Sequence, residues 1–206
     1  MTCLRITSRS ENKEDKVLDA KTHSVYFIHR LPLAKDMPTG LKQTSSVVAI
    51  SASTLESAAN TFSQSRISLD LSPLDNEVFV VVAVDINPSF PDALATVNTA
   101  TQACVSTTSR TTMGFIEDSN VLASGSTAIR AAGLVDGGVG FTQTSLETPP
   151  ANLDYIGIIA TNDFFLSIQG SGNTGAKTVG ARIWGYRAKA DANVFSALVQ
   201  SEVLSA

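Results

Sequence analysis

Short segments in which apolar and polar residues alternate recur along this chain, and they narrow its possible folds more than any other pattern. In its second half they follow one another closely, at residues 101–107, 112–117, 128–135, 139–146, 154–160, 163–169 and 178–187. Glycine, proline and asparagine mark the breaks between them. Many short strands at this spacing, with few long helices, are typical of an antiparallel sandwich or barrel. We therefore predict an all-β fold, an antiparallel β-sandwich.

The first half of the chain continues the pattern. Residues 23–29 alternate with period two, which predicts a strand ended by Pro32, and residues 47–51 are a second candidate. Nearly every residue of 78–84 is apolar. Because a strand in the middle of a packed sandwich is buried on both faces, this run predicts a central strand at 77–86.

Two short helices are expected between the early strands. Ser53 and Glu56 have the spacing of a capping box, and the apolar residues from 55 to 62 fall on one helical face. This pattern predicts a helix at 53–62. Asp92 is placed to cap a single helical turn at 93–97.

The chain is short enough for one folded domain, since separate cores become usual beyond roughly 250 residues. We expect a charged N-terminal arm at 1–22, the sandwich at 23–190, and a C-terminal tail at 191–206 whose apolar spacing suits a short helix. The arm is either mobile or ordered by contact with a partner. The longest apolar run is too short to cross a bilayer, which takes roughly 20 residues, and the charged N-terminus does not resemble a signal peptide.

Charge is spread unevenly and is scarce over most of the chain. Residues 1–42 hold 8 of the 15 basic and 5 of the 19 acidic residues, so the other 164 residues carry 7 basic and 14 acidic side chains, a net charge of −7. A free domain usually has a surface that is roughly a quarter or more charged. Either serine and threonine keep this surface soluble, or much of it faces neighbouring subunits. The overall charge of −4 argues against a protein that coats nucleic acid, and the interleaved charges of the arm give only weak support for direct nucleic-acid contact.

No catalytic, cofactor or metal site is expected. The run from Gly170 to Thr178 nearly spells a phosphate loop, but Ala176 separates the last glycine from Lys177, and a strand follows instead of a helix. We therefore predict a glycine-rich hairpin connection there. His23 and His29 lie roughly 20 Å apart along one strand, too far to bind the same ion. Cys104 is expected to be a small buried thiol.

Residues expected at interfaces lie on the last strand, in the tail and in the arm. Arg182, Trp184 and Tyr186 share one side of the last strand. These three residue types are enriched at interfaces, but the same set can bind a ligand or pack against the next layer. The other expected interface residues are Arg5, Arg9, Phe195 and Leu198.

The order of these elements resembles the single jelly-roll coat proteins of icosahedral viruses. The resemblance covers residues 23–188: a charged arm, about eight strands, short inserted helices, a strongly apolar central strand, and a final hairpin of 163–169 with 178–187. It implies an eight-stranded jelly roll that assembles with copies of itself into a shell. The nearly neutral arm departs from the strongly basic arm that many such proteins use to bind genome.

We therefore expect a structural, non-enzymatic capsid subunit located in the virion, assembled in the host cytoplasm, with itself and other virion proteins as partners. A capsid decoration protein has the same features. The alternative from another class is a carbohydrate-binding sandwich module, which predicts a monomer or dimer with aromatic rings exposed in a groove.

Overall fold

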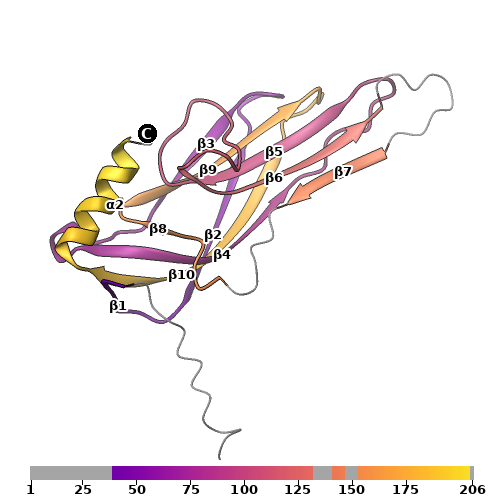
Figure 1. Ribbon diagram of the computed structural model, residues 1–206. Helices are drawn as coiled ribbons and strands as arrows, with labels where there is room; N and C mark the ends of the chain where they lie inside the picture. Colours follow the sequence, from indigo (N-terminus) through magenta and orange to yellow (C-terminus); the bar gives the residue numbers. More distant parts are fainter. Residues whose placement is uncertain (1–38, 132–140, 147–152, 205–206) are drawn as a thin grey trace, which may run out of the picture. The chain divides into compact units, whose positions relative to one another are not determined.

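The computed structural model describes residues 39–131, 141–146 and 153–204, which belong to the second of two compact units of the chain, Met37–Ala206. Among these residues, a pair of antiparallel β-sheets pack together, which confirms the predicted β-sandwich, and one α-helix follows the last strand (Figure 1). The elements are β1 (Leu41–Gln43), β2 (Val48–Leu55), β3 (Ser63–Ser68), the 3-10 turn η1 (Pro73–Asp75), β4 (Glu77–Pro88), β5 (Thr99–Ser106), β6 (Val121–Arg130), β7 (Phe141–Leu146), β8 (Gly157–Ile159), β9 (Asp163–Ser171), β10 (Thr178–Ala190) and α2 (Ala192–Leu204).

The first sheet, sheet A, is built around the longest strand, β10. Its order is β1-β10-β4-β8, and β2 also pairs with β10. β2 pairs with the first half of β10 and β1 with its end, so the two short strands share one edge of β10 while β4 occupies the other. Sheet A therefore has five strands but is only four strands wide.

The second sheet, sheet B, has the order β3-β9-β5-β6-β7. Across both sheets the pairing is nested: β2 pairs with β10, β3 with β9, β4 with β8, and β5 with β6. Along the sequence, both strands of each pair lie between the two strands of the pair named before it. All of these pairings are antiparallel.

The core lies between the sheets and consists of aliphatic and aromatic side chains from alternate strand positions. This buried cluster includes Phe79 and Val81 of β4, Leu166 and Ile168 of β9, and Ile183 of β10. Val78 and Val80 face the other side of β4 and are also buried. The expected central strand, buried on both faces, is therefore confirmed.

α2 explains why the outer face of β4 is buried. Val194, Phe195, Leu198 and Val199 of α2 pack against a second apolar cluster that contains Val78, Val80, Tyr186, Ala188 and Ala190. The helix covers only a portion of sheet A. No helix among the described residues is long and apolar enough to cross a membrane.

The helix predicted at 53–62 is wrong. Residues 48–55 form β2, with Ser53 opposite Gly180, and Glu56 turns into the protein instead of capping a helix. Its amide partners are Gly170 and Lys177, more than a hundred residues away, and no local pattern reveals them. The expected helical turn at 93–97 is also absent: a hydrogen-bonded turn and Thr96, with a left-handed φ of 63°, take its place.

Two further expectations are corrected. β9 and β10 do not form a hairpin, because β9 pairs with β3 and β5 in sheet B while β10 belongs to sheet A, so residues 172–177 cross between the sheets. Residues 112–117 form no strand but belong to the connection between β5 and β6. The arm, with Arg5 and Arg9, and the strand predicted at 23–29 lie outside the described residues.

Candidate functional site

The outer face of β10 carries the three residues expected at an interface on this strand, and their side chains differ in exposure. Arg182, Trp184 and Tyr186 alternate along β10; Arg182 is exposed, Trp184 is half-buried, and Tyr186 is 4% exposed in the cluster that α2 covers. Burial raises the pKa of Tyr186. Tyr186 thus belongs to the packing of α2, whereas Arg182 and Trp184 lie on the portion of the face that α2 does not cover.

Small side chains surround these two residues. Trp184 lies between Ala49 of β2 and Ala83 of β4 in the strand register. In the next row Arg182 lies between Ser51 and Asp85, and its Nε donates to Ser51 Oγ at 3.3 Å.

One row further, Gly180 lies between Ser53 and Asn87. A Cβ added at Gly180 would meet no atom within 4 Å. We call the three rows centred on Gly180, Arg182 and Trp184 the open face of sheet A; it carries one tryptophan, one pair of opposite charges and otherwise short side chains.

Phe195 and Leu198, also expected at an interface, are half-buried against the protein's own sheet. Near the end of the same helix, Glu202 is 8% exposed and its Oε1 accepts a hydrogen bond from the Ala160 amide at 3.0 Å. Oε2 has no hydrogen-bond partner among the described residues. Burial raises the pKa of Glu202, because the charged form loses its hydration.

At one end of the sandwich, polar side chains join three connections: those between β2 and β3, between β4 and β5, and between β9 and β10. The buried Glu56, just after β2, accepts hydrogen bonds from the Gly170 amide at 2.5 Å and the Lys177 amide at 2.8 Å. Asn60 and Asn173 exchange two hydrogen bonds of 2.8 Å between side chain and backbone. The β2–β3 connection is thereby fixed to residues 172–177.

Asp92 attaches the β4–β5 connection to the same loop. Its carboxylate pairs with Lys177 Nζ at 2.5 Å and accepts from the amide and hydroxyl of Thr174 at 2.8 and 2.7 Å. Lys177 and Thr174 hold the pKa of Asp92 well below its usual range. The lysine and loop amide that resemble a phosphate loop in the sequence are thus occupied by the protein's own carboxylate.

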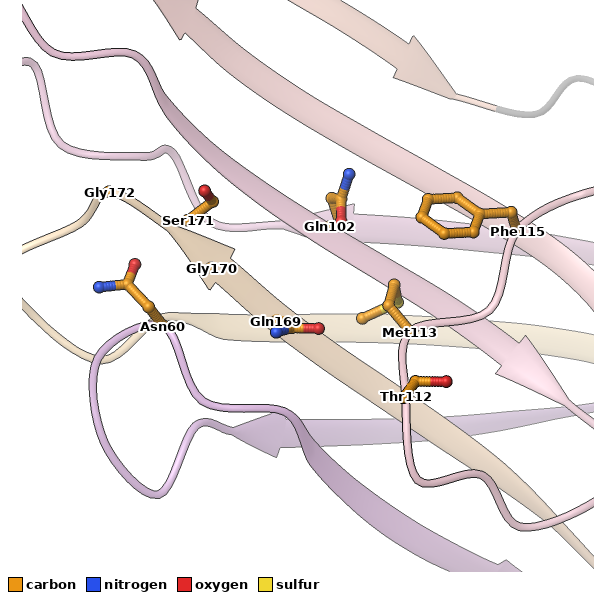
Figure 2. Close-up of a pocket in the computed structure, with 9 residues that line it drawn as sticks. All are labelled: Asn60, Gln102, Thr112, Met113, Phe115, Gln169, Gly170, Ser171 and Gly172. Carbon is orange, nitrogen blue, oxygen red and sulfur yellow. The ribbon is translucent and has the colours of Figure 1, made fainter.

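A groove of about 610 Å³ crosses the outer face of sheet B (Figure 2). Gln102 of β5 and Gln169 of β9 are direct cross-strand partners on its floor, with Ser171 at one end. Met113 and Phe115, from the β5–β6 connection, form a wall. Figure 2 shows the Phe115 ring directed over the sheet toward Gln102. We call this hollow the glutamine groove.

The wall is held in place by a second polar network. Arg110 donates to Asn120 Oδ1 at 2.6 Å and to Asp118 Oδ2 at 2.8 Å, and Asp118 Oδ2 also accepts from the Phe115 amide at 3.0 Å. Gly114 fits closely beneath: an added Cβ would lie 2.7 Å from Val121 Cγ2. The position of Phe115 therefore depends on hydrogen bonds and close packing.

The sequence contains little that reveals the glutamine groove. Alternation places Gln102 on one strand face with Cys104, which is correct, but its partner Gln169 lies on a segment 67 residues later. The exposed Phe115 and Ile116 fall in a segment for which the sequence predicts a strand. The pattern of that segment gives no sign that these two side chains would be exposed.

The described residues contain no group of histidine, cysteine and acidic side chains able to hold a metal ion. Cys104 is fully buried with Met113 and Val121, and this burial raises the pKa of its thiol. A thiol in such surroundings is a poor nucleophile. His23 and His29 lie outside the described residues. No family model matches the chain, and no curated protein matches it.

Proposed function

We propose that this domain is a jelly roll and that it serves as a structural subunit of a virion shell, binding copies of itself. The observation that carries the proposal is the nested pairing of β2 with β10, β3 with β9, β4 with β8, and β5 with β6. One long antiparallel hairpin rolled up into two sheets has this nesting. The resulting orders, β2-β10-β4-β8 and β3-β9-β5-β6, are those expected of such a roll, with β1 and β7 as additions at the edges.

Jelly rolls occur in viral capsid domains and in lectins, and the surface favours the capsid role. The 164 residues after position 42 carry only 7 basic and 14 acidic side chains. Large apolar side chains are exposed beside the joined connections: Leu55 is 61% exposed and Phe90 70%. Exposed apolar groups beside fixed connections suit a permanent contact with another subunit.

The open face of sheet A is the proposed contact between copies. Apart from Arg182 and Trp184 its side chains are short, so much of the backbone is open to a second copy, and Arg182 lies beside Asp85 on the neighbouring strand. In a two-fold contact each copy offers the same patch, so Arg182 of one copy can meet Asp85 of the other. The overall charge of −4 fits a subunit that makes little direct contact with nucleic acid. The proposed location is the virion, assembled in the host cytoplasm, where other virion proteins are further partners.

Light scattering coupled to size exclusion, with negative-stain images of each peak, tests the proposal. We expect closed particles or regular oligomers from the purified chain. Gly180→Arg places a long side chain on the open face without an internal clash, because nothing lies within 4 Å of its Cβ. This variant should lose assembly and keep its thermal unfolding midpoint.

Gln200→Arg is the matched control. Gln200 is exposed on α2, and the added charge is the same, but the residue lies outside the open face. A monomer of 21.6 kDa at every salt concentration and pH would overturn the shell role. Particles that form equally well from both variants would remove the open face from the assembly.

A further inference from the structure

We propose that the glutamine groove binds a neutral sugar unit, by stacking on Phe115 and by hydrogen bonds to Gln102 and Gln169. This site lies on the outer face of sheet B, whereas the proposed contact between copies uses sheet A. The two proposals are therefore tested separately.

The floor of the groove offers unused hydrogen-bonding groups. Within the described residues, neither the Gln102 nor the Gln169 side-chain amide has a hydrogen-bond partner. Each amide offers two donor hydrogens and a carbonyl acceptor. Two adjacent amides can therefore bind neighbouring hydroxyl groups, each of which both donates and accepts.

The wall supplies an aromatic surface. Phe115 is 46% exposed although its backbone is fixed through the Asp118 carboxylate. The face of an aromatic ring is electronegative and attracts polarised C–H groups, such as those on the apolar face of a pyranose. Because the backbone that carries the ring is already fixed, only the side chain needs to be ordered on binding.

The chemistry of the lining selects among ligand classes. None of the nine residues labelled in Figure 2 is charged, whereas phosphate and carboxylate ligands are usually held by arginine or lysine. A peptide that binds by adding a strand needs a free strand edge, but β5 and β9 are each paired on both sides. The volume of about 610 Å³ lies within the range of ordinary small-ligand sites.

Saturation-transfer NMR on the full chain tests the proposal. The probes are methyl α-mannoside, methyl β-galactoside and methyl β-N-acetylglucosaminide at about 5 mM, a concentration suited to weak single-sugar binding. We expect saturation transfer to at least one of them. Phe115→Ala should weaken that binding about tenfold, which corresponds to the loss of one good contact.

Leu74→Ala is the control, since Leu74 is an apolar residue in η1 that is 97% exposed and does not line the glutamine groove. The double variant Gln102→Ala/Gln169→Ala should also lose binding while its thermal unfolding midpoint stays close to that of the parent. Absence of saturation transfer to all three sugars would overturn the proposal. So would equal binding by Phe115→Ala and Leu74→Ala.

Discussion

At the scale of single residues, two glycines of β10 have opposite surroundings, and they yield a matched prediction. A Cβ at Gly185 would lie 2.4 Å from Phe79 Cε1 and 2.5 Å from the Val80 carbonyl oxygen, whereas a Cβ at Gly180 would meet nothing. Gly185→Ala should lower the free energy of unfolding by about 2 kcal/mol, because the backbone or Phe79 must move. Gly180→Ala should stay within about 0.5 kcal/mol of the parent in the same urea titration. Equal stabilities would contradict the close packing of Phe79 against β10.

At the scale of elements, α2 carries a buried carboxyl group that should make its packing depend on pH. Burial raises the pKa of Glu202 above its ordinary value of 4.5, so the folded chain holds this proton more tightly than the unfolded chain. The contribution of Glu202 to stability is then full below pH 4.5 and is lost as the pH rises through the raised pKa.

Glu202→Gln keeps an oxygen that can accept from the Ala160 amide and removes the charge. We expect the variant to gain on the order of 1 kcal/mol in unfolding free energy at pH 8 and to show a flatter pH profile. Urea titrations between pH 4 and 8 measure both effects. Glu117→Gln, at an exposed position, should follow the parent. Parallel profiles for Glu202→Gln and the parent would show that this carboxyl group does not govern the packing of α2.

Also at this scale, most strands could be predicted because alternation is a local signal. β4, β5, β9 and β10 lie close to their predicted positions. The predicted helix at 53–62 is wrong because the role of Glu56 depends on distant partners. Glu56 has a capping-box spacing, but its oxygens accept hydrogen bonds from amides 114 and 121 residues away. The glutamine groove could not be predicted either, because Gln102 and Gln169 are far apart in the sequence and only strand pairing brings them together.

At the scale of the whole molecule, the open face of sheet A should respond to charge exchange. Arg182→Asp and Asp85→Arg each place like charges together in a two-fold contact, so each should raise the concentration needed for assembly by about tenfold or more. The double variant restores opposite charges and should recover assembly, as measured by light scattering. A double variant that remains dispersed, or single variants that assemble normally, would contradict a two-fold contact through this pair.

The nested pairing also has a consequence for how the chain acquires its structure during synthesis. β10 is the shared partner of β1, β2 and β4, so β1 and β2 have no partner in sheet A, and β4 has only β8, until β10 has left the ribosome. Contacts between residues far apart in sequence are slow to form, because long loops must close first. The edges of the early strands therefore stay unpaired during synthesis, and unpaired strand edges are prone to aggregation. A chaperone that shields these edges until translation reaches β10 should increase the yield of folded protein more than one that acts only after release.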